Sequence, residues 1–294
     1  MPTVVIVGFM YNFGDSHLRS TITDIYQVYS FYRDLKYRVY IASDISEIIE
    51  PKDIAFLYTN KIVDTNFKEF IHKQFLNIRH LVRNHRELER FFDQIKITAD
   101  RRLIFYYTGH GIKDHILLPD DSKFSALDLR SKIINLGSDG DMSDGDKFGN
   151  NSVSSGLNSV GSQIFIIFDC CNPHGLYLPF QMNRINYDYD LIGNNFTLPE
   201  LILVTSSESD SQSQAHFNYS PFTKELFEVF RGKSKKYDFQ SIINTLDNNL
   251  DDQKIVVRSS TPKLRISWPW VVQNFIDFYV NDVFDSIVVR RNET

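Results

Sequence analysis

Residues Ile164 to Gly175 read IFIIFDCCNPHG, an apolar run followed at once by an acid, two cysteines and a turn-forming segment. The apolar part has the length and the β-branched and aromatic content of a strand, and polar residues do not interrupt it. An unbroken apolar strand is typical of a sheet that is covered on both faces. We therefore interpret this stretch as a buried strand that ends at chemically reactive side chains.

The same design recurs along the chain. Further apolar runs of strand length are Val4 to Phe9 (VVIVGF), Leu103 to Tyr107 (LIFYY), Leu201 to Thr205 (LILVT) and the weaker Tyr37 to Ala42 (YRVYIA). Apolar residues recur at helical spacing in Ser20 to Leu35, Phe67 to Ile97, Pro221 to Phe230 and Phe239 to Leu250. Strands that alternate with helices predict an α/β fold, with a mostly parallel central sheet and helices on both faces.

Composition narrows the possible functions. The chain has 294 residues, 42% of them hydrophobic, which excludes a wholly disordered protein. Its formal charge is −5, so no basic excess favours nucleic acid as a partner. We expect no secretory or membrane-spanning segment, since Met1 to Met10 lacks a basic start and Trp268 to Val289 carries three aspartates. Cys170 and Cys171 are adjacent, which argues against a disulfide framework and favours a reducing, cytoplasmic location.

Residues 137–161 differ from the rest, because they are rich in Asp, Gly and Ser and poor in apolar residues. We predict a disordered surface insertion within a single domain that spans residues 1–294. Asp139 and Asp141 suit the first ligand positions of a calcium loop, but Asp144 stands where its turn needs glycine. We therefore expect a solvated acidic loop and assign no metal site.

The chemistry is expected at the carboxyl ends of the strands, where ligands bind in parallel α/β sheets. Leu103 to Tyr107 is followed by His110 between two glycines, and Ile164 to Phe168 is followed by Cys170 and Cys171. A thiol becomes a strong nucleophile as a thiolate, and an imidazole is its usual activator. Backbone N–H groups of Gly111 and of the cysteine would then hold the developing oxyanion.

These residues also carry a resemblance to a family. Tyr107 to Gly111 (YTGHG) and Phe168 to Gly175 (FDCCNPHG) resemble the His and Cys motifs of caspase-like cysteine peptidases, most closely those of metacaspases. The likeness extends over Ile6 to Ile45, Val204 to Phe227 and Ser259 to Ser267, in the correct order. The resemblance implies a caspase-like three-layer sandwich, a Cys–His dyad and polypeptide substrates. We expect no cofactor.

The resemblance also implies roles for individual residues. His110 matches the catalytic histidine, Cys171 matches the nucleophile and Cys170 matches a variable position. The first subsite (S1) of metacaspases takes a basic residue through two aspartates, and Asp24 and Asp169 stand at the matching positions. Thr21, where the family has Cys, and Thr108, where it has Ser, are assigned to the same pocket. The expected activity is therefore cleavage after Arg or Lys.

Several departures from the family pattern leave a second function open. Asn172 to His174 replaces the usual His-Ser, and Ser220 replaces a Gly. The acidic insertion that binds calcium in metacaspases is shortened here, which argues against calcium dependence, and Asp120 and Asp121 stand where a remnant of it would lie. The alternative is a catalytically silent caspase-like scaffold that binds partners. Such a scaffold is expected to lose Cys171 or His110, and this chain retains both.

Overall fold

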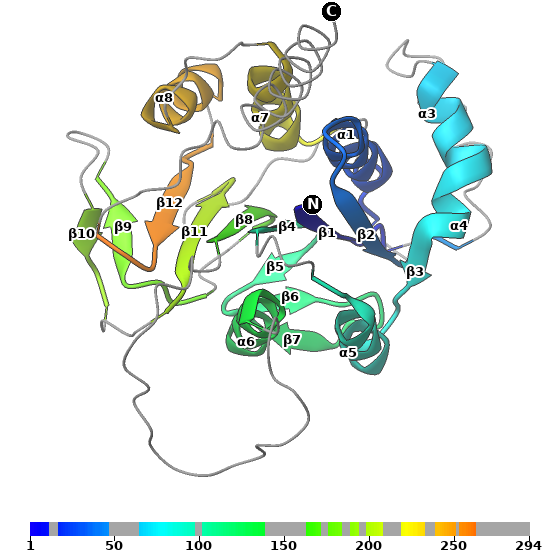
Figure 1. Ribbon diagram of the computed structural model, residues 1–294, viewed down its shortest axis with the longest axis horizontal. Coiled ribbons are helices and arrows are strands. Elements are labelled where there is room, and N and C mark those ends of the chain that lie inside the picture. Colours follow the sequence, from blue (N-terminus) through cyan, green and yellow to red (C-terminus); the bar gives the residue numbers. More distant parts are fainter. Residues whose placement is uncertain are drawn as a thin grey trace, which may run out of the picture.

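The computed structural model describes residues 1–11, 17–46, 65–97, 102–138, 163–171, 176–183, 189–193, 198–207, 219–232, 239–250 and 253–262. Among these residues, the central feature is a nine-stranded sheet (Figure 1). Its strands, in spatial order, are β10 (Tyr189–Leu191), β9 (Phe180–Met182), β12 (Val256–Ser259), β11 (Glu200–Thr205), β8 (Gln163–Asp169), β4 (Arg102–Thr108), β1 (Thr3–Gly8), β2 (Arg38–Ser43) and β3 (Arg79–Leu81). The six strands from β11 to β3 are parallel, and β12, β9 and β10 add an antiparallel edge.

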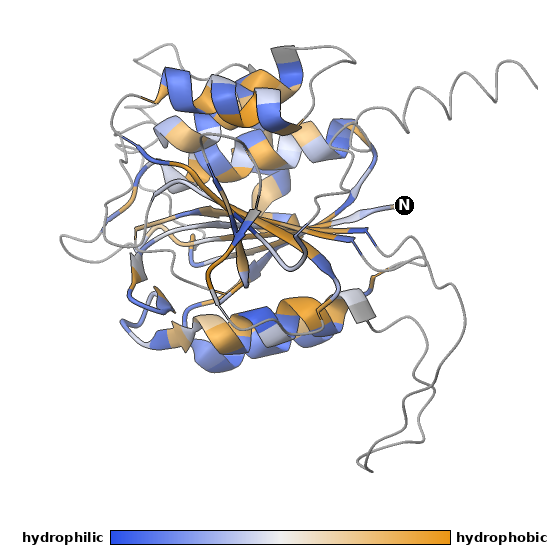
Figure 2. Cartoon of the chain, turned by 90° about the vertical axis from the view of Figure 1, so that its left-hand side faces the viewer, coloured by the Kyte–Doolittle hydropathy of each residue, from blue (hydrophilic) through white to orange (hydrophobic). Residues whose placement is uncertain are grey.

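Helices cover both faces of this sheet (Figures 1 and 2). One face carries α1 (Thr21–Asp34), α7 (Pro221–Gly232), α8 (Phe239–Asn249) and the run α3 (Thr65–Glu69), η2 (Phe70–Phe75) and α4 (Leu76–Ile78). The other face carries α5 (His85–Gln94), α6 (Ala126–Ser138) and a small antiparallel sheet of β5 (Gly111–Ile112), β6 (His115–Leu117) and β7 (Lys123–Ser125). This architecture confirms the α/β sandwich that the sequence predicts.

Two hydrophobic cores explain why the strands are apolar without interruption. Successive side chains of a strand point to opposite faces of the sheet. Accordingly, Val4 and Ile6 pack into the core under α1, α7 and α8, whereas Val5 and Val7 pack into the core under α5 and α6. All four side chains are fully buried, so both faces of β1 are covered.

One sequence expectation was wrong in detail. Phe67 to Ile97 shows helical periodicity throughout, but β3 interrupts it and joins the edge of the sheet beside β2. A new helix, α5, then begins after Asn84, whose side chain accepts a hydrogen bond from the Glu87 N–H at 3.1 Å. This N-cap satisfies a helix donor that would otherwise lack a partner. The predicted insertion lies almost entirely outside the described residues, which include only its first two positions, in α6.

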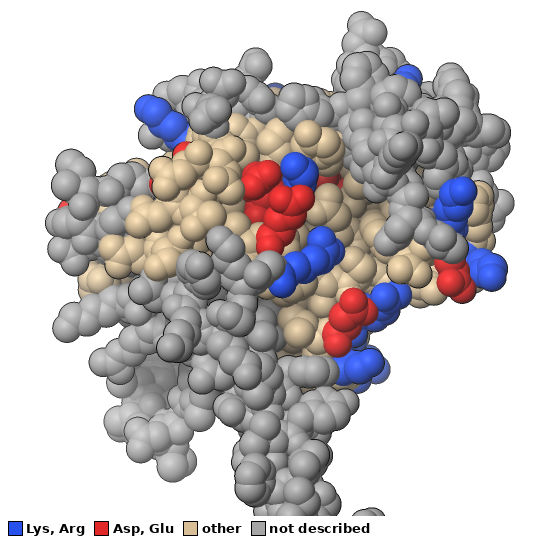
Figure 3. Space-filling view, turned by 90° about the horizontal axis from the view of Figure 1, so that it is seen from above, with Lys and Arg blue, Asp and Glu red and all other residues tan. Residues whose placement is uncertain are grey.

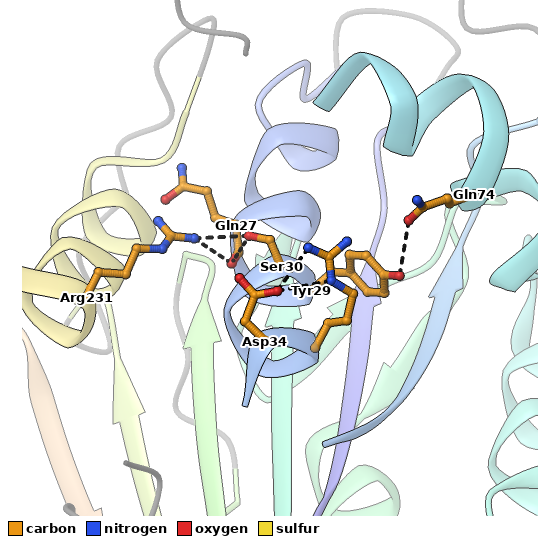
Figure 4. Close-up of polar contacts among 7 residues, drawn as sticks. Gln27, Tyr29, Ser30, Asp34, Gln74 and Arg231 are labelled. Atoms are coloured by element: carbon orange, nitrogen blue, oxygen red, sulfur yellow. Dashed lines mark hydrogen bonds and ion pairs between the residues drawn. The ribbon is translucent and has the colours of Figure 1, made fainter. Parts of the chain in front are cut away.

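Polar contacts fix α1 between its neighbours on the helical face (Figure 4). The Arg231 guanidinium of α7 donates to the Gln27 carbonyl at 3.0 Å and to Ser30 Oγ at 3.1 Å. On the opposite side, the Tyr29 hydroxyl donates to the Gln74 side chain at 3.3 Å. The Arg231 contacts hold α1 against α7, and the Tyr29 contact holds α1 against η2. Both α1 and α7 begin at the candidate site.

The surface over α1, α7 and α8 mixes charges of both signs. Lys and Arg lie beside Asp and Glu in Figure 3, and the described residues on this face form no extended patch of one sign. Arg33 pairs with Asp34 at 3.0 Å, and Lys224 lies 3.4 Å from Glu225. The Arg33–Asp34 pair is exposed, and an exposed pair contributes little to stability.

Candidate active site

The register of two neighbouring strands places His110 beside the cysteines. β4 and β8 run parallel, and their last paired residues are Thr108 and Asp169. His110 and Cys171 each lie two residues beyond this last pair. The chain segments remain together past the strand ends, since the Gly109 N–H donates to the Asp169 carbonyl at 3.4 Å. The structure thus brings together the two residues that the sequence assigns to the dyad.

Gly111 is the point of closest approach between the two segments. A Cβ atom at this position would overlap the Cys171 carbonyl oxygen and lie 3.1 Å from Cys170 Sγ. Only glycine leaves room for this approach of two main chains. The N–H groups proposed for the oxyanion, those of Gly111 and Cys171, therefore belong to residues in direct contact.

The two cysteines differ in environment. Cys170 is buried, whereas Cys171 and His110 are partly exposed at the end of the sheet. Burial raises the pKa of the Cys170 thiol well above its ordinary value, and the charges of Asp169 and Cys171 raise it further. Since the thiolate is the reactive form, this environment disfavours Cys170 as a nucleophile. Ser207 fixes the main chain here by donating to the Cys170 carbonyl at 3.1 Å.

Asp24 and Asp169 form a buried acidic pair beneath the start of α7. Asp24 Oδ1 accepts the Ser220 N–H at 3.0 Å. Asp169 Oδ2 accepts the hydroxyls of Ser220 and of Thr223, the latter at 2.6 Å. Asp24 Oδ2 is buried and has no hydrogen-bond partner among the described residues.

Burial raises the pKa of the Asp24 carboxyl well above its ordinary value, and the charge of Asp169 raises it further. Hydrogen bonds from the Ser220 N–H and the Ser20 side chain oppose this shift only in part. Two adjacent carboxyls in a desolvated site resist carrying two negative charges together. The pair therefore has the chemistry to receive a cationic group, which would relieve both the burial cost and the repulsion.

The two threonines assigned to the pocket take different positions. Thr21 is fully buried at the start of α1, and its hydroxyl donates to the Phe9 carbonyl at 3.0 Å. It thereby joins the helix that carries Asp24 to the end of β1. Thr108 is also buried, and its carbonyl accepts the Phe9 N–H at 3.1 Å. Thr21 lies three residues before Asp24 in α1, and Thr108 pairs with Asp169 across β4 and β8, so both threonines are structural neighbours of the carboxyls.

The candidate calcium residues make local contacts. Asp120 Oδ1 accepts the backbone N–H of Ser122 at 3.1 Å and its hydroxyl at 2.6 Å, which closes a turn. Among the described residues, no group of three or more His, Cys, Asp or Glu side chains is placed to hold a metal ion. The acidic stretch from Asp139 and the altered turn at Asn172 to His174 lie outside the described residues.

Sequence reasoning missed two contributors to the site, Asp44 and Thr223. Asp44 lies just beyond the weaker strand-like run Tyr37 to Ala42. Its place at the carboxyl end of a strand is the signal in the sequence that points to it. Its carboxylate accepts the N–H groups of Met10 and Tyr11, each at 2.7 Å. Thr223 lies in the segment that resembles the family, but no feature of the sequence points to a bond with Asp169.

An α/β sandwich with a His and a Cys just beyond two adjacent parallel strands is the arrangement of caspase-like proteins. The caspase-domain model of the C14 peptidases matches residues 2–275, so the chain belongs to this family of cysteine peptidases. A crystal structure of a protein from Geobacter sulfurreducens is similar in fold, with a TM-score of 0.50 and 11% sequence identity over 90% of this chain and 96% of that one. The search of curated proteins found no significant match. No helix within the described residues is long and apolar enough to cross a membrane.

Proposed function

We propose that the protein is an active cysteine endopeptidase that cleaves polypeptides after Arg or Lys, as metacaspases do. The observation that carries the proposal is the placement of His110 and Cys171 two residues beyond the paired strand ends, with Gly111 packed against the Cys171 carbonyl. Membership of the caspase-domain family makes polypeptides the expected substrate class.

In the proposed reaction, His110 takes the thiol proton of Cys171, and the thiolate attacks the scissile carbonyl carbon. The N–H groups of Gly111 and Cys171 donate to the resulting oxyanion. When the C–N bond breaks, His110 returns the proton to the leaving amine, and a thioester remains on Cys171. Water, deprotonated by His110, then hydrolyses the thioester, which releases the acid product and restores the thiol.

The proposed specificity rests on Asp24 and Asp169. One buried carboxylate oxygen, Asp24 Oδ2, lacks a hydrogen-bond partner among the described residues. A substrate guanidinium or ammonium would give it a charge-assisted hydrogen bond, whereas an acidic side chain would meet like charge. Ser220 is hydrogen-bonded to both carboxyls, to Asp24 through its N–H and to Asp169 through its hydroxyl. The hydroxyl must therefore release Asp169 before a substrate side chain can bind between the two.

The test is hydrolysis of peptides that differ only at P1, with Arg, Lys, Gln or Asp before the scissile bond. We expect turnover of the Arg and Lys peptides by the full chain and none by Cys171→Ala. Turnover of the Asp peptide alone would overturn the specificity. Absence of turnover on every peptide and on an unfolded protein substrate, with intact fold by circular dichroism, would favour the alternative, a silent scaffold that binds partners.

A further inference from the structure

We propose that Tyr11, itself held by the carboxylate of Asp44, is a positioning residue for His110. This inference rests on the proposed function, in which His110 is the base. It concerns the segment after β1, which the dyad and the acidic pair do not include.

The Tyr11 side chain contacts His110 through both its ring and its hydroxyl. The ring centroid lies 4.6 Å from that of the imidazole. The hydroxyl accepts the His110 backbone N–H at 2.8 Å and donates to the Leu117 carbonyl at 2.9 Å. A single side chain thus limits both the main-chain position and the ring orientation of the histidine.

The hydroxyl of Tyr11 belongs to a small buried network around the His110 main chain. Tyr107, the neighbouring phenol at 3.2 Å, donates to the His110 carbonyl at 2.8 Å. The Leu117 N–H donates to the same carbonyl at 3.0 Å. Burial raises the pKa of Tyr11 well above its usual range, so this phenol stays neutral and keeps its proton for Leu117. Hydrogen-bonded buried networks of this kind favour one arrangement of their members.

Asp44 accounts for the conformation of Tyr11. Tyr11 has a backbone φ of 53°, in the left-handed region that bulky residues rarely adopt. Asp44 is 7% exposed, and its two oxygens accept the N–H groups of Met10 and Tyr11 at 2.7 Å each. Strained backbone of this type persists where the surroundings fix it, and it is common at functional sites. The chain of contacts runs from Asp44 through Tyr11 to His110.

The test uses the full chain in a Cys170→Ala background, so that only Cys171 can be alkylated. Tyr11→Phe removes the hydroxyl and keeps the ring, whereas Asp44→Asn leaves one of the two N–H groups without an acceptor. The matched control is Tyr32→Phe, since Tyr32 is fully buried in the other core and its hydroxyl has no partner among the described residues. Two readouts are compared: kcat and KM on the Arg peptide, and the rate of Cys171 alkylation by iodoacetamide across pH. The second needs no substrate.

For Tyr11→Phe we expect kcat to fall about tenfold or more with little change in KM, as for a misplaced catalytic group. We also expect the alkylation profile to shift to higher pH, toward that of His110→Ala, while Tyr32→Phe leaves both readouts unchanged. Normal kcat and a normal profile in Tyr11→Phe, with both altered in His110→Ala, would overturn the inference and leave the dyad standing. An unchanged profile in His110→Ala would overturn the dyad first, and the inference with it. If Tyr11→Phe fails to fold, the same outcomes apply to Asp44→Asn.

Discussion

The main chain of Gly111 packs against the carbonyl group of Cys171 so closely that a methyl group at position 111 would overlap the oxygen. This contact joins the segment after β4 to the segment after β8. Together with the parallel register of β4 and β8, it brings His110 and Cys171, 61 positions apart in the sequence, to the same end of the sheet.

Gly111→Ala should therefore separate the two segments and lower kcat/KM on the Arg peptide about 100-fold, the scale of a 1 Å misplacement. The matched control is Gly193→Ala, where an added Cβ would meet its nearest neighbour at 3.8 Å, an ordinary contact. Steady-state kinetics and thermal unfolding are compared for both variants. Full activity in Gly111→Ala would contradict the close contact.

His110→Ala should lower kcat by ~10²–10⁴-fold, because one imidazole both removes the thiol proton and protonates the leaving amine. The control is His72→Ala, an exposed histidine on η2, which should behave as the unaltered protein does. Steady-state assays at neutral pH measure kcat for both variants. Near-normal turnover in His110→Ala would assign the proton transfers to another group.

Asp169→Ala should cost about 3 kcal/mol in kcat/KM on the Arg peptide, the scale for truncating one partner of a buried charge pair. The loss should be much smaller on the Gln peptide, since a neutral side chain gains nothing from the carboxylate. The ratio of the two kcat/KM values separates specificity from structure. An equal loss on both peptides would show that Asp169 supports the fold through Ser220 and Thr223 instead.

Asp24 makes stability depend on pH in a direction opposite to that of most carboxylates. Its pKa is raised in the folded chain by burial and by Asp169, so the folded state holds the proton more tightly than the unfolded state. Its contribution to stability is then complete below the ordinary pKa of an aspartate and is lost as pH rises toward the raised value.

Asp24→Asn mimics the protonated form and should raise Tm at neutral pH, by an amount that shrinks as pH falls toward 4. The same variant should lower kcat/KM on the Arg peptide. Asp93→Asn, at an exposed carboxylate, serves as the control. Thermal unfolding across pH measures the difference, and parallel curves for Asp24→Asn and the unaltered chain would contradict the raised pKa.

Much of the fold follows from the sequence because the parallel strands are short, apolar and buried on both faces. β1, β4, β8 and β11 lie within one residue of the predicted runs at each end. The stretch Phe67 to Ile97 predicts helix throughout, because the residues of β3 also fit a helical period. Only their pairing with β2 gives these residues extended structure. The antiparallel strands β9 and β10 are three residues long, too short for a periodic signal.

The residues of the candidate site also differ in how readily the sequence reveals them. His110, Cys171, Asp24 and Asp169 stand out as motif positions next to strands or helix starts. Thr223 does not, because its importance arises from a contact between segments far apart in the chain, and Asp44 follows only the weakest of the strand-like runs. Asp44 acts on Met10 and Tyr11 from 33 or 34 positions away, and Thr223 reaches Asp169 from 54.

The most direct test of the central claim compares Cys171→Ala and Cys170→Ala on the Arg peptide. We predict loss of activity in Cys171→Ala and nearly unaltered kcat/KM in Cys170→Ala, because Cys171 is partly exposed beside Gly111 while Cys170 is buried. Circular dichroism is used to check that both variants fold. Equal loss in the two folded variants, or activity that survives Cys171→Ala, would contradict the assignment of Cys171 as the nucleophile.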